Sequence, residues 1–158
     1  MKGKKGIMCL AALGTAAYFL CCCRRGNRHR ALVEENNRYT DNYFLLNHWL
    51  EARNNGKSTA DFFLENGYRD MAIYGMGELA NRLCEELQGT EVHIRYGIDR
   101  EPCGTVSRMD RIYTPDEKLE DVDAVIVTPF YAMESIRSAL KEKVSCPILS
   151  IEEVVWSL

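Results

Sequence analysis

The chain has 158 residues, a length that accommodates one domain of ordinary size together with an appendage. Its formal net charge is −3 at pH 7. Because nucleic-acid binding needs a basic face that releases counterions from the phosphates, this balance argues against a nucleic-acid partner.

The N-terminal part contains an uncharged segment, residues 6–23, which basic residues flank on both sides. At a rise of about 1.5 Å per residue, a helix of this length is about 27 Å long, which is the short end of what spans a bilayer. We therefore expect residues 1–30 to form a single-pass membrane anchor. Positive charge is slightly heavier on the C-terminal flank, which predicts that the following domain lies on the cytoplasmic side.

Other interpretations of this segment leave different marks. A cleaved signal peptide needs small residues after its apolar core, but residues 18–20 extend the core. A lipoprotein site needs a small residue before its cysteine, and Leu20 precedes Cys21. A buried core helix is a further alternative, which the arginine cluster after residue 23 disfavours. The cysteines at 21–23 are either acylated at the membrane edge or simple apolar fillers.

Residues 31–55 have the pattern of an amphipathic juxtamembrane helix. Apolar side chains recur at intervals of seven, four, three and four residues, at Leu32, Tyr39, Tyr43, Leu46 and Leu50. Phe44 and Trp49 stand beside this stripe. We expect the stripe to pack on the following domain; pairing with a second copy of the chain is the alternative, for which two heptads are few.

Residues 56–158 are predicted to form a nucleotide-binding domain, because a dinucleotide-binding fingerprint begins at residue 71. A buried strand, residues 71–74, leads through Gly-x-Gly-x-x-Ala into an apolar-periodic helix. Gly75 allows the tight turn, Gly77 lets backbone amides approach a pyrophosphate, and Ala80 allows close packing of helix on strand. The N-terminus of the helix offers free N–H groups to an anion.

Strand-like and helix-like segments alternate after this turn. The nearly all apolar segment 122–127 is typical of a central parallel strand that is covered on both faces. Further strands are expected at 92–98, near 111–113 and at 147–149, and further helices up to residue 87, around 133–140 and over 151–156. The alternation predicts an α/β fold with one Rossmann-like parallel sheet in the order 3-2-1-4-5.

Ligands of such sheets bind beyond the carboxyl ends of the strands, where the strand order reverses. The residues predicted to contact the cofactor are Gly75, Met76, Gly77, Glu78, Asp99, Arg100, Thr128 and Tyr131. Asp99 is expected to accept hydrogen bonds from ribose hydroxyls, which favours NAD over NADP; its alternative role is that of a turn residue. Glu78 departs from a pyrophosphate site, because its carboxylate competes with an incoming anion unless it points away.

The sequence offers little catalytic equipment. Enzymes on this fold often use a Tyr-x-x-x-Lys pair, but Tyr113 is followed by Glu117 and Tyr131 by Ser135 at that spacing. None of the three histidines stands near a candidate nucleophile, and no metal-ligand spacing is present. The catalytic residues, if any, are unknown, and the isolated chain is not expected to be an enzyme.

Five segments carry a resemblance to a known family: IYGMGEL (73–79), GID (97–99), IYTPDE (112–117), DAVIVT (123–128) and PILS (147–150). They resemble the small Rossmann domains found alone or fused to enzymes of cell-surface polysaccharide and sugar-nucleotide metabolism. The latter half is also similar to the C-terminal Rossmann domain of sugar C-methyltransferases. The resemblance implies NAD or a sugar nucleotide as ligand and carries over no catalytic residue.

Three functions are compatible with these features. The first is a membrane-anchored cytoplasmic Rossmann domain that binds NAD or a sugar nucleotide and has an accessory or sensing role near envelope polysaccharide synthesis. The second is an oxidoreductase or epimerase that a partner subunit completes. The third is a structural adaptor with a degenerate nucleotide site, for which Glu78 is the best argument. A partner enzyme or a homodimer fits all three.

Overall fold

The computed structural model describes residues 2–101, 109 and 111–158, with side chains described from residue 24 onward. The chain divides into two compact units, Met1–Tyr43 and Phe44–Leu158. A continuous helix, α1 (Lys2–Asn54), begins in the first unit and ends in the second. The side chains of the predicted anchor, residues 6–23, lie outside the described residues. Among the residues that are described, no helix is long and apolar enough to cross a membrane.

The second unit contains a five-stranded parallel sheet, which confirms the predicted fold class and strand order. The sheet has the order β3-β2-β1-β4-β5. The strands are β1 (Asp70–Tyr74), β2 (His93–Ile98), β3 (Ile112–Tyr113), β4 (Ala124–Val127) and β5 (Ile148–Ser150). Every residue of β4 is buried, as the nearly all apolar segment 122–127 predicts for a central parallel strand.

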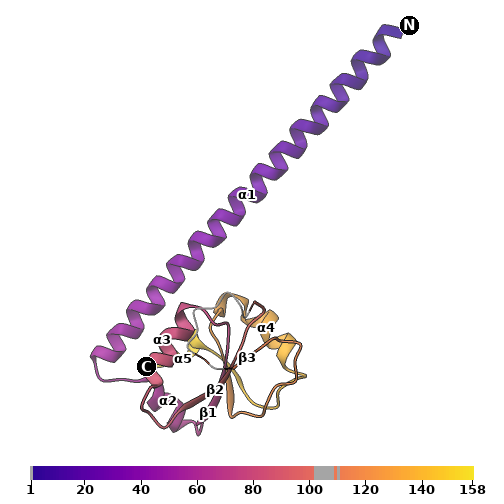
Figure 1. Cartoon of the computed structure of the whole chain (residues 1–158). Coiled ribbons are helices and arrows are strands. Elements are labelled where there is room, and N and C mark those ends of the chain that lie inside the picture. The colour runs from indigo at the N-terminus through magenta and orange to yellow at the C-terminus, as the bar shows by residue number, and fades with distance from the viewer. Residues whose placement is uncertain (1, 102–108, 110) are drawn as a thin grey trace. The chain divides into compact units, whose positions relative to one another are not determined.

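Helices cover both faces of the sheet. Figure 1 shows α2 (Thr59–Glu65), α3 (Glu78–Leu87) and α5 (Ile151–Trp156) on one side and α4 (Met133–Leu140) on the other. Alternate residues of β1 divide between these two layers: Ile73 packs with α3 and α5, and Tyr74 packs with α4. The side chain of Ser150 accepts a hydrogen bond from the backbone of α5, and the Glu153 carboxylate accepts one from the backbone N–H of Ser150. These two bonds form the capping box that begins this helix.

The face of α1 that packs on the sheet domain is not the predicted stripe. Leu45, Trp49 and Ala52 are buried in the second unit. Two residues of the predicted stripe, Leu46 and Leu50, also belong to the second unit, and they are 37% and 58% exposed. The expectation that the stripe packs on the domain is therefore wrong for this part of it. Leu45 and Trp49 belong instead to the hydrophobic core that also contains residues of α2, α3 and α5.

Glu86 of α3 joins the end of α1 to the beginning of α2. Its Oε2 accepts a hydrogen bond from Trp49 Nε1 at 2.5 Å, and its Oε1 accepts one from the Thr59 backbone N–H at 3.0 Å. Trp49 is 3% exposed, so its indole N–H needs an acceptor inside the protein. Thr59 N–H belongs to the first turn of α2 and has no partner within that helix. One carboxylate thus satisfies two donors from different elements.

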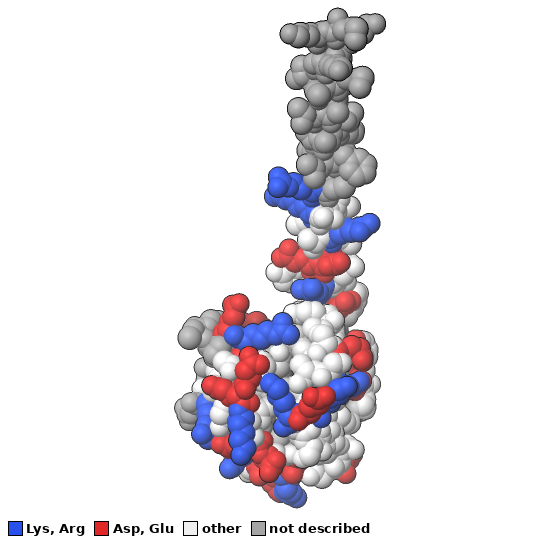
Figure 2. Space-filling model, turned by 90° about the vertical axis from the view of Figure 1, so that its right-hand side faces the viewer, with Lys and Arg blue, Asp and Glu red and all other residues white. Residues whose placement is uncertain are grey.

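The surface of the sheet domain is mixed in charge. Figure 2 shows Lys and Arg side chains interspersed with Asp and Glu over the face turned to the viewer. One such exposed pair joins Arg82 to Glu85 on α3, with 2.9 Å between Nη1 and Oε2. Pairs of this kind contribute little to stability, because water screens both charges. The pair therefore serves as a control for the Glu86 contacts.

We expect Glu86→Ala to lower the free energy of unfolding by about 1–3 kcal/mol, because the substitution leaves two donors without an acceptor. Glu86→Gln should cost less, since its amide oxygen keeps one bond. The measurement is urea unfolding of a chain that begins at residue 31, followed by tryptophan fluorescence. Glu85→Ala is the matched control and should change stability by about 0.5 kcal/mol or less. Equal losses in the Glu86 and Glu85 variants would contradict this role of Glu86.

Candidate nucleotide site

The glycine turn, Gly75-Met76-Gly77, lies where the strand order of the sheet reverses. It follows β1, whose neighbours are β2 on one side and β4 on the other, and it leads directly into α3. Ligands of open parallel sheets bind at such a switch point, beyond the carboxyl ends of the strands. The predicted site residues on the ends of β1, β2 and β4 therefore meet at one edge of the sheet.

Gly75 is required by both its backbone and its surroundings. Its φ is +88°, a left-handed conformation that L side chains rarely adopt. A Cβ here would lie 2.5 Å from Pro129 Cδ and 2.9 Å from Thr128 Oγ1. The Thr128 hydroxyl donates a hydrogen bond to the Gly75 carbonyl at 2.6 Å. Thr128, which the sequence analysis assigns to ligand contact, is buried and holds the glycine turn against the end of β4.

Met76 points into the protein. Its side chain is 2% exposed and occupies the space over β2 where Gly97 has no side chain. A Cβ on Gly97 would lie 2.6 Å from Met76 Sδ. Gly97 is absent from the predicted contact residues, although a glycine within a strand often marks a close approach. Met76 thus contributes backbone to the candidate site, while its side chain anchors the turn in the core.

Gly77 has neither constraint. Its φ is −96° and its ψ −161°, an extended conformation open to any residue, and a Cβ would meet no atom of the described residues within 4 Å. Gly77 is the N-cap of α3, and no side chain caps this helix end. The first N–H groups of a helix have no partner within it. Neither the backbone conformation nor the described neighbours therefore requires a glycine at this position. The approach of a ligand to this backbone stays a prediction.

Asp99 binds the turn from the end of β2. Its Oδ2 accepts a hydrogen bond from the Met76 backbone N–H at 2.7 Å, and its Oδ1 accepts one from Glu101 N–H at 2.9 Å. The carboxylate thus accepts hydrogen bonds from the backbone after β1 and after β2, which agrees with its alternative role as a turn residue. The ribose contact stays a prediction. Arg100 is exposed beside it, and residues 102–108, which continue this loop, lie outside the described residues.

The segment after β4 completes the described part of the site. A short 3₁₀ helix, η2 (Phe130–Ala132), follows Pro129, whose ring packs against Gly75. Tyr131 is 53% exposed and lies edge-on to Phe130, with 6.3 Å between the ring centroids. Glu78, the first residue of α3, is exposed as well. Aromatic and acidic side chains thus stand on the two elements that adjoin the glycine turn.

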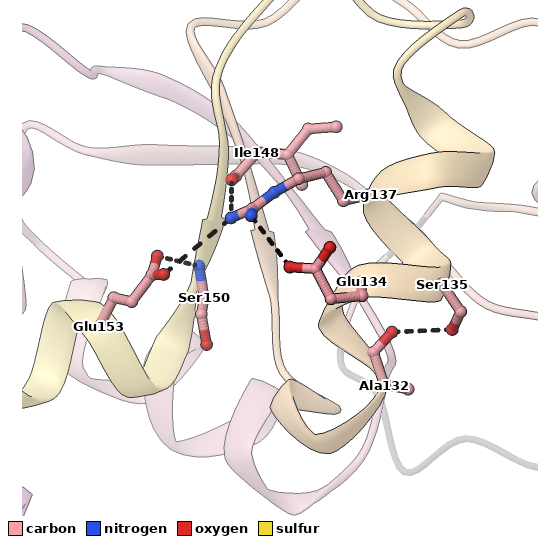
Figure 3. Close-up of polar contacts among 7 residues, drawn as sticks. All are labelled: Ala132, Glu134, Ser135, Arg137, Ile148, Ser150 and Glu153. Carbon is pink, nitrogen blue, oxygen red and sulfur yellow. Dashed lines mark hydrogen bonds and ion pairs between the residues drawn. The ribbon is translucent and has the colours of Figure 1, made fainter.

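Arg137 of α4 binds the edge strand β5 (Figure 3). Its guanidinium donates to the Ile148 carbonyl at 3.4 Å and pairs with Glu134 at 3.4 Å and Glu153 at 4.0 Å. The Ile148 contact covers a carbonyl on the edge strand β5. Because Glu153 belongs to α5, its ion pair with Arg137 connects helices on opposite faces of the sheet.

The described residues show no activated nucleophile or metal centre. Burial raises the pKa of the Cys84 and Cys146 thiols, so both stay protonated at neutral pH. Within residues 24–101, 109 and 111–158, no group of three His, Cys, Asp or Glu side chains is placed to hold a metal ion. Neither of these two thiols is therefore activated as a nucleophile.

We expect Gly75→Ala to lower the free energy of unfolding by about 1–3 kcal/mol, through backbone strain and the clash with Pro129. Gly77→Ser should change it by about 0.5 kcal/mol or less, because the position is open and serine is a good N-cap. Urea unfolding of the chain that begins at residue 31 measures both. A large loss in Gly77→Ser would show that Gly77 is needed for the fold, which would remove the reason to connect it with a ligand.

No protein-family model, no curated protein and no solved structure matches this chain. Its fold is a parallel α/β sheet of Rossmann-like order, and such folds host many functions. Function must therefore be argued from the glycine turn and the residues around it.

Proposed function

We propose that this protein is a membrane-anchored domain that binds NAD or a sugar nucleotide at the glycine turn. The observation that carries the proposal is Gly77 at the N-terminus of α3, a position where a side chain would contact none of the described residues. Because glycine has no side chain, an anion can approach the first backbone amides of the helix at this point. The partial positive charge of the helix end favours a pyrophosphate there.

The nucleoside half of the ligand would lie toward β2. An ionised carboxylate has about four acceptor sites, and the two described backbone contacts of Asp99 use one on each oxygen. Each oxygen keeps one site for a ribose hydroxyl. The negative charge would repel a 2′-phosphate, so the proposal favours NAD over NADP. Tyr131, on the opposite side of the glycine turn, offers an exposed aromatic surface to the rest of the ligand.

The proposed location follows from the N-terminal sequence. Residues 6–23 lack charge and have basic flanks, which supports an anchor with the sheet domain on the cytoplasmic side. The resemblance to domains of sugar-nucleotide metabolism supports an accessory or sensing role near envelope polysaccharide synthesis. Catalysis would need groups from a partner enzyme, because the described residues supply no activated nucleophile.

A second candidate is a structural adaptor with a degenerate site. It is favoured by Asp99, whose carboxylate is already bound by two backbone amides, and by Glu78, whose negative charge stands at the mouth of the proposed anion site. In an adaptor the glycine turn would have a structural role only and would bind no nucleotide. Ligand binding separates the two candidates.

We expect the full-length chain in detergent to bind NAD or a uridine-diphosphate sugar, and Gly77→Val to abolish that binding. Asp99→Asn should weaken it about tenfold, since it loses a charge-assisted bond of about 1.5 kcal/mol, and should reduce discrimination against NADP. Calorimetric titration measures the affinities. Glu142→Gln, an exposed carboxylate on the turn after α4, is the matched control and should bind as the wild type does.

Two results would contradict this prediction. If the wild type binds none of these nucleotides, the adaptor is the better description. If it binds but both variants keep the wild-type affinity, the ligand lies elsewhere on the chain. Melting curves without ligand are recorded alongside, because Asp99 also supports the backbone and a partly unfolded variant would mimic weak binding.

The anchor has its own test. The full-length chain should fractionate with membranes and resist carbonate extraction, because an apolar segment of this length is stable in lipid. A chain lacking residues 1–30 should be recovered in the soluble fraction. The comparison uses equal expression of both chains and a blot of each fraction. Recovery of the full-length chain in the soluble fraction would overturn the anchor without affecting the nucleotide site.

A further inference from the structure

We propose that α1 pairs with α1 of a second copy of this chain, in register and in parallel, to form a short coiled coil. The contact is a seam of six residues: Leu32, Asn36, Tyr39, Tyr43, Leu46 and Leu50. This inference does not depend on the nucleotide site or on the anchor.

The seam has the repeat of a coiled coil. Leu32, Tyr39 and Leu46 are seven residues apart and occupy d positions, while Tyr43 and Leu50 are seven apart and occupy a positions. The helix is continuous through all of them. Positively ionisable residues replace apolar ones just beyond the seam, with His29 at the preceding a position and Arg53 at the next d position. The apolar repeat is therefore bounded at both ends.

The apolar side chains of this seam are exposed in the single chain. The exposed fraction is 56% for Leu32, 67% for Tyr39, 37% for Leu46 and 58% for Leu50. Apolar side chains at this density on one helix face are costly in water. Leu45, Trp49 and Ala52, which bind the helix to the sheet domain, lie on a different face. Pairing along the seam and docking on the domain are therefore compatible.

Three features identify the occupant as a second copy in parallel. Knobs-into-holes packing needs a partner with the same repeat, and a second copy has it by identity. In parallel register Asn36 meets Asn36 of the second copy, whereas an antiparallel pair would bury it against Leu46 without a polar partner. At the flanks, Glu35 would face Thr40 and Arg28 would face Val33, so parallel pairing brings no like charges together there.

We expect sedimentation equilibrium of the full-length chain in detergent to give twice the 18.1 kDa chain mass at tens of micromolar. The double variant Tyr39→Glu, Leu46→Glu should raise the dissociation constant at least about a hundredfold, because it places like charges at two d positions. Phe44→Glu is the matched control, since it makes the same kind of change on another face of α1, and should stay dimeric. Circular dichroism checks that each variant keeps its helix.

A second measurement uses the unaltered seam. A photoactivatable phenylalanine analogue at position 46 should capture a second copy, whereas the same analogue at Asp41, on the outer face of the helix, should not. A monomeric wild type, a double variant that stays dimeric, equal capture from positions 46 and 41, or an adduct with another protein would each overturn the proposal. Dimerisation lost in the double variant alone, with capture confined to position 46, would support it.

Discussion

The structure depends on how the glycine turn after β1 is held from both sides. The Thr128 hydroxyl binds the carbonyl of Gly75 from β4, and the Asp99 carboxylate binds the N–H of Met76 from β2. The Met76 side chain fills the space that Gly97 leaves free. Since β1 is central in the sheet, these contacts set the position of α3 relative to three strands at once.

This support has a consequence for function. If only a ligand ordered the turn, each binding event would include the entropic cost of ordering it. In this protein, contacts with the ends of the strands have already fixed the backbone of the turn. Within the described part of the chain, Gly77 is the residue of the turn that the surrounding contacts leave unconstrained. The turn thus separates into a fixed part, which belongs to the fold, and an open part, to which the proposed function assigns an anion.

The helix α1 shows that one amphipathic segment can serve two surfaces. A narrow face with Leu45, Trp49 and Ala52 packs on the domain, where Glu86 accepts the bond of the buried indole. The broader apolar face remains exposed and carries the seam. Hydrophobicity alone would favour burying the predicted stripe in the core of the domain. Complementary shape and a buried hydrogen bond decide instead which side chains enter the core.

The sequence by itself determined the strands, their parallel order and the turn, because nearly all apolar segments such as 122–127 and the Gly-x-Gly-x-x-Ala pattern are local signals that the sheet reinforces. Only the tertiary structure decided the partners of polar and apolar side chains. Thr128 and Asp99 have the chemistry of ligand contacts in sequence, yet both bind backbone groups far away along the chain. The same holds for Trp49, whose partner Glu86 is 37 residues away. The periodicity of the sequence indicates which side chains can be buried. Which of them are buried depends on distances between residues that are far apart in the sequence.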